Sequence, residues 1–148
     1  PAYYSLNSFN VVKGFQSQKY TFMTTANNHS LDGGEPGILS TIHILKSENI
    51  AFNGMNQSED EAFSATLIEK KGIKIGLICH TFGLNAKKPP VGKPWIVNRT
   101  DLNNKIEEID FTQIEKQIQF CRKNQADAII AQLHWGLEHE YYPRPEQL

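Results

Sequence analysis

Ala26-Asn27-Asn28-His29-Ser30-Leu31-Asp32-Gly33-Gly34 is the stretch around which this chain of 148 residues is organised. An apolar run over residues 20–25 precedes it, and a helical pattern over residues 36–46 follows it. The polar stretch therefore stands where a strand ends and a helix begins. Ligands of open α/β sheets bind outside the carboxyl ends of strands, so this position suits a functional site. The same composition of Asn, Ser, Asp and Gly is also that of an ordinary loop.

A second stretch repeats this order of features. The apolar run Ile129–Leu133 leads into His134-Trp135-Gly136-Leu137-Glu138, and His80 likewise follows the run over residues 73–79. If these strands are parallel neighbours, the side chains that follow them share one edge of a sheet.

This arrangement leads to a geometric prediction for Asn28, His29 and His134. We expect the three side chains to converge at one sheet edge, within about 10 Å, which agrees with direct or water-bridged contact to shared ions. Histidine and asparagine at such a place can ligate a metal or stabilise an oxyanion, and histidine can also transfer a proton.

Length, composition and charge restrict the class of protein. A chain of 148 residues suits one globular domain with a substantial core. The net charge of −1 gives no reason to expect nucleic acid or an anionic membrane surface as a partner. No apolar run approaches the ~20 residues of a membrane span. Cys79 and Cys121 lack metal-type spacing, and we interpret both as buried thiols rather than a disulfide.

Hydrophobic periodicity predicts an α/β layered fold with a mixed sheet. Residues 126–133 form a near-continuous apolar run, as expected for a strand in a sheet covered on both faces. Residues 81–98 hold three prolines and two glycines; a loop this long is usually functional or mobile, and we expect it to border the pocket. The other expected elements are a helix over 5–18, strands over 20–25 and 50–53, a helix over 36–46, a turn capped by Ser58, a hairpin of 65–69 with 73–79, and a helix ending near Asn124.

The two polar strings, in this order, resemble the bacterial capsule synthesis family of CapA type. That family is linked to poly-γ-glutamate capsules and is related to the calcineurin-like metallophosphoesterases. Residues 82–85 and 90–98 also resemble it, and the likeness runs from about Tyr20 to Gln147. The resemblance implies part of a four-layer α/β/β/α metallophosphoesterase-like sandwich. It also implies a place in the cell envelope, extracytoplasmic or membrane-associated.

The resemblance implies roles for residues of both strings. Asn28 and His134 match metal ligands, and His29 matches the general acid beside the metals. The phosphoesterases usually have an acid directly after this histidine; here Ser30 follows, and Asp32 would orient His29 instead. The alternatives are a hydrogen bond that closes the loop for Asn28, a backbone-bonded core-edge histidine for His134, and a turn or cap for Asp32.

Further residues are candidates for contact with substrate. Glu138, Asn85 and His80 would touch the substrate or the primary ligands. Lys93 and Arg99 could meet an anionic polymer. The alternatives are a solvated acid for Glu138, solvated loop residues for Asn85, Lys93 and Arg99, and an incidental histidine for His80.

The implied cofactor is a divalent metal, two ions of Mn, Zn or Fe in the full-length protein. The leading hypothesis is a capsule biosynthesis protein with a metal-dependent hydrolase site. The alternative is a non-catalytic member that binds the anionic capsule polymer or its synthase complex. The sequence lacks the Asp-x-His, Gly-Asp and Gly-His-x-His motifs of metallophosphoesterases. We therefore interpret residues 1–148 as one domain, the central fragment of a longer CapA-like domain, and expect it to be inactive, to bind metal weakly and to self-associate through unpaired sheet edges.

Overall fold

The structure, a computed structural model, describes Gly14 and residues 21–148. Apart from Gly14, the helix expected over residues 5–18 lies outside the described residues. Helices and strands follow one another along the chain in an α/β pattern. In order they are β1 (Phe22–Thr24), α2 (Gly34–Ser47), β2 (Ala51–Asn53), α3 (Glu59–Ala62), β3 (Thr66–Lys70), β4 (Ile73–Thr81), η1 (Pro94–Ile96), η2 (Ile106–Glu108), α4 (Thr112–Lys123), β5 (Ala128–His134) and η3 (Pro145–Gln147).

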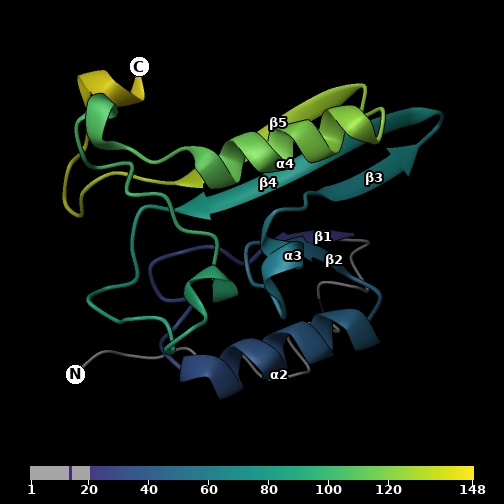
Figure 1. The fold of residues 1–148 in the computed structure, drawn as a ribbon, viewed down its shortest axis with the longest axis horizontal. Coiled ribbons are helices and arrows are strands. Elements are labelled where there is room, and N and C mark those ends of the chain that lie inside the picture. The colour runs from purple at the N-terminus through teal and green to yellow at the C-terminus, as the bar shows by residue number, and fades with distance from the viewer. Residues whose placement is uncertain (1–13, 15–20) are drawn as a thin grey trace.

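The described strands form two small sheets. β1 and β2 pair in parallel, while β4 lies between β3, its antiparallel neighbour, and β5, its parallel neighbour. The second sheet is therefore mixed, and the expected α/β class is confirmed. Helix α4 runs along the three-stranded sheet, and α2 lies on the opposite side of the molecule, next to β1 and β2 (Figure 1).

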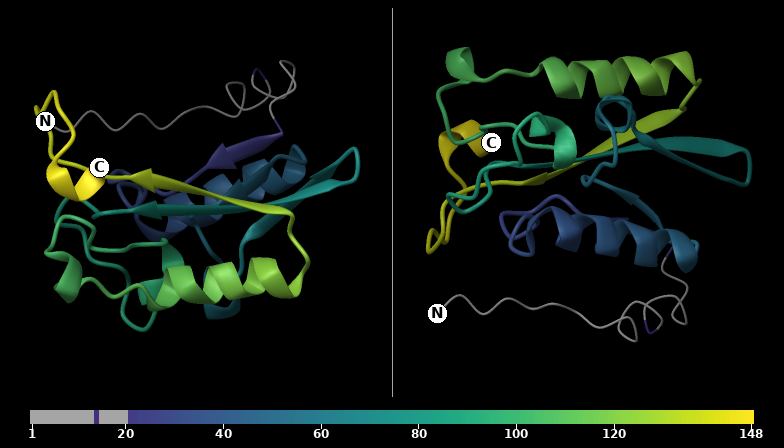
Figure 2. Two further views of the ribbon diagram at one scale, coloured as in Figure 1. Left: turned by 90° about the horizontal axis from the view of Figure 1, so that it is seen from above. Right: turned by 60° about the horizontal axis from the view of Figure 1, so that its bottom comes forward.

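The carboxyl ends of the parallel strands open on one side of the molecule. The arrowheads of β1, β4 and β5 all point the same way (Figure 2, left). In the register of β4 and β5, Thr81 lies opposite His134, and Gln132 Nε2 of β5 lies 3.5 Å from Thr24 Oγ1 of β1. Residues that follow β1 and β5 are thereby brought to a common end.

Helix α2 is held by one apolar face. Ile38, Ile42 and Leu45 are buried, and Ile38 and Ile42 join a core with residues from the loops after β1, β2 and β4. Leu39 is also apolar but is 40% exposed. It lies next to Ile38 in sequence, about 100° around the helix, and thus at the edge of the buried face.

Helix α4 packs on β4 through a second core that includes Ile78 and Cys121. A Cβ on Gly76 would lie 2.4 Å from Cys121 Sγ, so the approach of helix to strand requires glycine at this position. Cys79 and Cys121 are both free and buried, as expected. Burial raises the pKa of the Cys79 thiol to about 12, so this thiol is inert near neutral pH.

A group of amides, the asparagine network (buried Asn53, Asn56 and Asn98 with half-buried Gln113), connects the two sheets. Asn53 Oδ1 accepts a hydrogen bond from the Cys79 backbone N–H at 2.9 Å and one from Asn98 Nδ2 at 3.3 Å. Asn98 Oδ1 accepts from Asn56 Nδ2 at 2.9 Å and from Gln113 Nε2 at 2.7 Å. Side-chain bonds thus link β2 to β4, strands of separate sheets.

Strand β5 differs from its prediction. A strand covered on both faces was expected from its apolar sequence, but all seven residues of β5 are exposed, including Ile130 at 52%. Its ladder partner in the structure is β4. Apolar composition reports a preference for burial, but the tertiary arrangement decides whether a covering element is present, so the prediction of two covered faces was wrong for the described residues.

Local signals at element ends were mostly correct. The hairpin is closed by Lys71 and Gly72, both with positive φ, and Ser58 Oγ caps α3 by accepting from the Glu61 N–H. Asp110 accepts from the Thr112 N–H at the start of α4. Among the described residues, no helix combines the length and apolar character needed to cross a membrane.

Candidate functional site

The loop after β1 is built by its own small polar side chains. Ser30 Oγ donates to the Thr25 carbonyl at 2.6 Å and accepts from the Asn27 N–H at 2.8 Å. Asn27 Oδ1 accepts from the His29 N–H at 2.8 Å, an Asx turn. A Cβ on Gly54, at the end of β2, would lie 2.4 Å from the Ala26 nitrogen, so a glycine allows the close approach that anchors this loop. Ser30 is therefore a structural residue of this loop.

Asp32 supplies a carboxylate beside the imidazole of His29. Its Oδ2 lies 2.6 Å from His29 Nδ1, and the side chain of His29 is 56% exposed while that of Asp32 is 12% exposed. Because an ionised carboxylate only accepts hydrogen bonds, Nδ1 carries the proton. The Nε2 lone pair of His29 is then available, and the expected pairing of Asp32 with His29 is confirmed in geometry.

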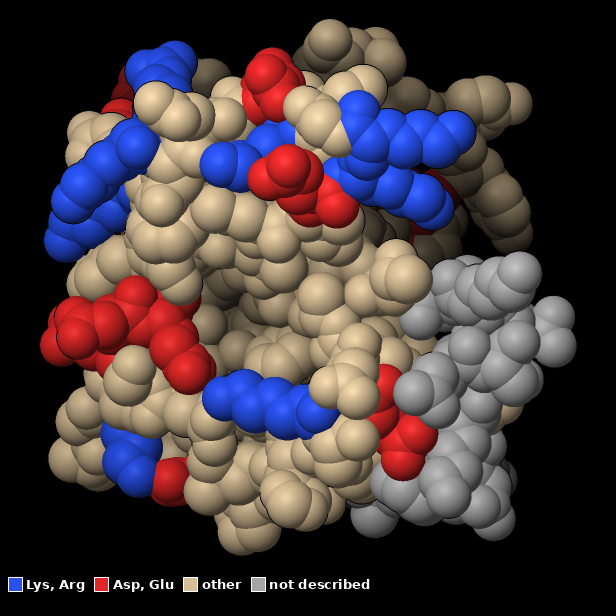
Figure 3. All heavy atoms as spheres, turned by 90° about the vertical axis from the view of Figure 1, so that its right-hand side faces the viewer, with Lys and Arg blue, Asp and Glu red and all other residues tan. Residues whose placement is uncertain are grey.

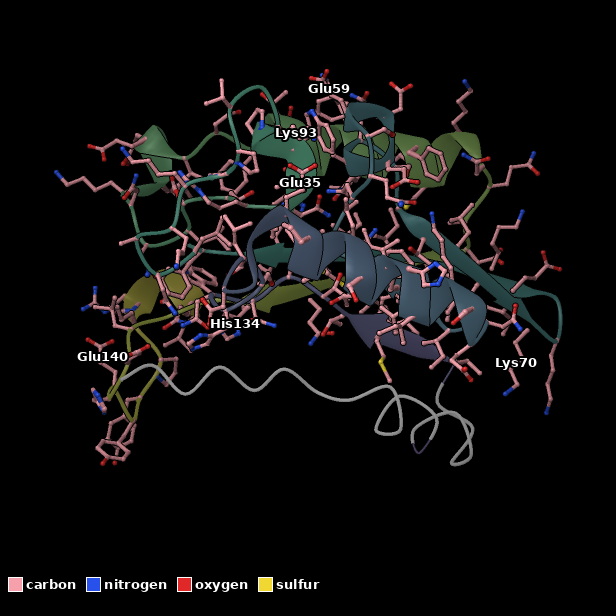
Figure 4. All side chains as sticks on the ribbon, turned by 90° about the horizontal axis from the view of Figure 1, so that it is seen from below. Glu35, Glu59, Lys70, Lys93, His134 and Glu140 are labelled. Carbon is pink, nitrogen blue, oxygen red and sulfur yellow. The ribbon has the colours of Figure 1, made fainter. Side chains whose placement is uncertain are left out.

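His134, at the end of β5, meets Asn28. His134 Nε2 lies 3.0 Å from Asn28 Oδ1, and the imidazole stacks on the ring of Phe82 with centroids 6.1 Å apart. The Phe82 N–H also donates to the His134 carbonyl at 3.0 Å. The two polar strings of the sequence, more than 100 residues apart, therefore converge as predicted, and Figure 4 shows His134 at this end of the molecule.

Asn85, which lies in the loop over residues 81–98, connects Asn28 to His29. Its Oδ1 accepts from Asn28 Nδ2 at 3.0 Å, and its Nδ2 lies 3.4 and 3.5 Å from the two ring nitrogens of His29. The long loop thus borders the site, as expected. We call Asn28, His29, Asp32, Asn85 and His134 the strand-end cluster.

His80 does not belong to this cluster. It is fully buried, with Nε2 2.9 Å from Gln117 Oε1 and Nδ1 3.0 Å from Thr100 Oγ1. Burial lowers its pKa, and the hydrogen bond to Gln117 opposes that effect. The ring therefore serves the packing of α4 on β4 and is closed to substrate. Its position at the end of an apolar run did not show which face of β4 it would take.

The remaining candidates are placed on the surface. Glu138 is exposed on the segment after β5. Lys93 forms an ion pair with Glu35, toward which it points in Figure 4, and Arg99 pairs with Asp101 at 3.0 Å. Each of these two cations therefore has an acidic neighbour. On the face shown in Figure 3, basic and acidic side chains are likewise interspersed, without one continuous basic area among the described residues.

The strand-end cluster contains two side-chain donors that suit a metal ion. Asn28 Oδ1 and His134 Nε2 face each other across 3.0 Å and are an acceptable oxygen–nitrogen pair for a divalent ion. Among the described residues, however, no group of three or more His, Cys, Asp or Glu side chains could hold a metal. A catalytic zinc site normally has three protein ligands. The described residues therefore do not supply the donor set of a catalytic zinc site by themselves.

The fold and the site together define a class of protein: an α/β domain with a histidine–carboxylate pair at the ends of its strands. The sequence model of the bacterial capsule synthesis protein PGA_cap matches residues 3–148. The chain thus belongs to this family, as its motifs indicated.

Two curated relatives agree with this assignment. The capsule biosynthesis protein CapA of Bacillus anthracis is 24% identical over 140 residues, which cover 92% of this chain and 32% of the relative. The PGA biosynthesis protein CapA of Bacillus subtilis (strain 168) is 28% identical over 141 residues, which cover 92% of this chain and 33% of the relative. The chain spans about a third of the length of these relatives.

Proposed function

We propose that this chain acts in the synthesis of a bacterial capsule polymer of poly-γ-glutamate type, and that the strand-end cluster is its reactive site. Membership of the capsule synthesis family supports the process, and the names of the two relatives agree with it. The observation that carries the choice of site is the exposed His29 with its Nδ1 held by Asp32. We propose that the full-length protein acts in the cell envelope and that its partner is the anionic polymer or its synthase complex.

The chemistry proposed for the cluster is proton transfer during hydrolysis. Asp32 fixes the tautomer of His29 and stabilises the imidazolium, so that Nε2 can take a proton from, or return one to, an oxygen of the substrate. Asn85 lies next to the imidazole of His29 and is hydrogen-bonded to Asn28, and Asn28 in turn contacts His134. We propose that the site is metallophosphoesterase-like and that the fold is part of a four-layer α/β/β/α sandwich.

A divalent ion, or a pair of ions of Mn, Zn or Fe, would polarise the scissile bond in such a site. Asn28 and His134 are the donors that this chain offers, and two donors are too few for a stable site. We therefore expect the 148-residue chain alone to be inactive and to bind Mn²⁺ and Zn²⁺ weakly in a calorimetric titration. Tight binding of two ions would show that the chain carries a complete donor set.

The second candidate function is binding of the polymer or the synthase without turnover. The observation that favours it is that both atoms of the Asn28 amide are engaged within the cluster, by Asn85 and His134. The sheet edge at β5 could in addition pair with a second copy, and self-association of the isolated chain is part of this proposal.

The test is replacement of His29→Ala in the full-length protein, with polymer yield and polymer binding measured in parallel. Loss of a general acid or base commonly costs about 10²–10⁴ in rate, so we expect yield to fall by at least 100-fold with binding intact. His43→Ala, an exposed histidine on α2, is the matched control. Loss of binding together with yield would favour the non-catalytic function, and unchanged yield would exclude His29 from both.

A further inference from the structure

The contact between Asn85 and His29 has an unusual geometry. Asn85 Nδ2 is nearly equidistant from Nδ1 and Nε2 of the imidazole, at 3.4 and 3.5 Å. A donor in the ring plane and in line with one nitrogen lone pair would be much farther from the other nitrogen. The amide group therefore lies over the face of the ring rather than at its edge.

This face contact selects one orientation of the Asn85 amide. The face of an aromatic ring is electron-rich, so it attracts N–H groups and repels a carbonyl oxygen. With its NH₂ group over His29, Asn85 turns Oδ1 toward Asn28, where it accepts from Nδ2 at 3.0 Å. Asn28 Oδ1 is then the atom that faces His134 Nε2 at 3.0 Å, and that nitrogen must carry its proton.

We propose that Asn85 is a positioning residue that orients the amide of Asn28 and, through it, the ring of His134. The inference deepens the function proposed above and rests on it for its biological consequence. The two histidines then have opposite tautomers, with the proton on Nδ1 of His29 and on Nε2 of His134. His29 therefore has a free lone pair on Nε2 for the substrate. His134 instead has an N–H group at Nε2, which donates to Asn28.

The backbone holds Asn85 in this place. The Lys87 N–H donates to the Leu84 carbonyl at 2.8 Å, and the two residues between them, Asn85 and Ala86, have φ of 47° and 60°. These are features of a type I′ turn. Leu84 is only 4% exposed and belongs to the α2 core, so the turn is anchored. Asparagine tolerates the left-handed conformation better than most residues, which suits it to carry the amide here.

The experiment observes the ring N–H groups directly. Full-length protein labelled with ¹⁵N-histidine and freed of divalent metal with EDTA, because a metal ion on Nε2 of His134 would displace its proton, is compared at low temperature and pH 8.5, well above the ordinary histidine pKa of about 6.5. In Asn85→Gly the amide is lost but the turn is kept, because glycine adopts positive φ freely. Asn85→Asp keeps an oxygen that accepts from Asn28. Asn49→Gly, at another asparagine with positive φ (54°), is the matched control.

We expect a protected Nε2–H signal of His134 in the wild type, in Asn49→Gly and in Asn85→Asp. In Asn85→Gly the signal should disappear, because Asn28 is free to rotate and its oxygen no longer offers a fixed acceptor. An unchanged signal in Asn85→Gly, or a proton on Nδ1 of His134 in the wild type, would overturn the proposal. The measurement needs no polymer, so its result is independent of whether the capsule function itself is correct.

Discussion

Asparagine and histidine form two groups in this fold, and the groups differ in access to solvent. The strand-end cluster keeps a histidine that is 56% exposed, whereas Asn98 of the asparagine network and His80 beside it are fully buried. A buried polar group must find all its partners within the protein. An exposed group can leave one atom free for a ligand. For the two histidines, burial rather than residue type therefore separates the structural side chain of His80 from the solvent-accessible side chain of His29.

The largest expected effect is on the buried side of this comparison. Asn98→Ala would remove four side-chain hydrogen bonds, to Asn53, the Cys79 carbonyl, Asn56 and Gln113. Several amide groups would each lose one of their hydrogen bonds and a buried space would be left, at a cost of about 3 kcal/mol or more in the free energy of unfolding. Urea denaturation measures this.

Asn28→Ala is the matched change in the strand-end cluster: Asn28 is itself only 8% exposed, but its partners Asn85 and His134 are exposed. We expect it to cost about 1 kcal/mol or less, because its partners can turn to water. Equal losses of stability in the two variants would contradict the division into a buried and an exposed group.

The next effect is the response of stability to acid. His80 has a pKa below its ordinary value in the folded protein because it is buried, so the unfolded chain binds its proton first. The stability contributed by neutral His80 is fully present above the unfolded pKa of about 6.5 and is lost as pH falls toward the folded value. The slope cannot exceed about 1.4 kcal/mol per pH unit for one proton. Denaturation curves between pH 8 and pH 5 measure it, and a slope that persists unchanged in His80→Gln would assign it to other groups.

The smallest effect concerns the turn that carries Asn85. Ala86 has a φ of 60°, a conformation that costs an L-residue other than glycine about 1–2 kcal/mol. Ala86→Gly relieves this cost but adds conformational freedom to the unfolded chain. We therefore expect the free energy of unfolding, measured by thermal denaturation, to rise by about 0.5–1 kcal/mol. The strand-end cluster should keep its NMR signals. A destabilised Ala86→Gly variant would show that the turn is not strained as described.

The sequence allowed the strand-end cluster to be predicted because its signals are local. Each string followed a strand-like run, and parallel strands bring their carboxyl ends to one edge. The meeting of Asn28 with His134 followed from that rule. The same rule misassigned His80, because a side chain near the end of a strand can point to either face of the sheet. For β4, α4 covers the face on which His80 lies.

Two further features depended on contacts distant in sequence. The exposed β5 could not be recognised from its apolar composition, because exposure depends on what packs against a strand and not on the strand itself. The asparagine network joins residues 15 to 45 positions apart, and nothing in the local pattern around Asn53 or Asn98 distinguishes them from loop residues.

By itself, the amino-acid sequence determined the α/β class, the positions of most helices and strands, and the two polar strings that mark the site and the family. These follow from periodicity and turn chemistry over a few neighbouring residues. Only the tertiary structure decided which histidine is buried, which strand is exposed, and that Asn85 lies over the ring of His29. Those outcomes depend on packing between distant segments. A side chain on one face of a strand is buried, whereas its neighbour on the other face can be exposed to solvent.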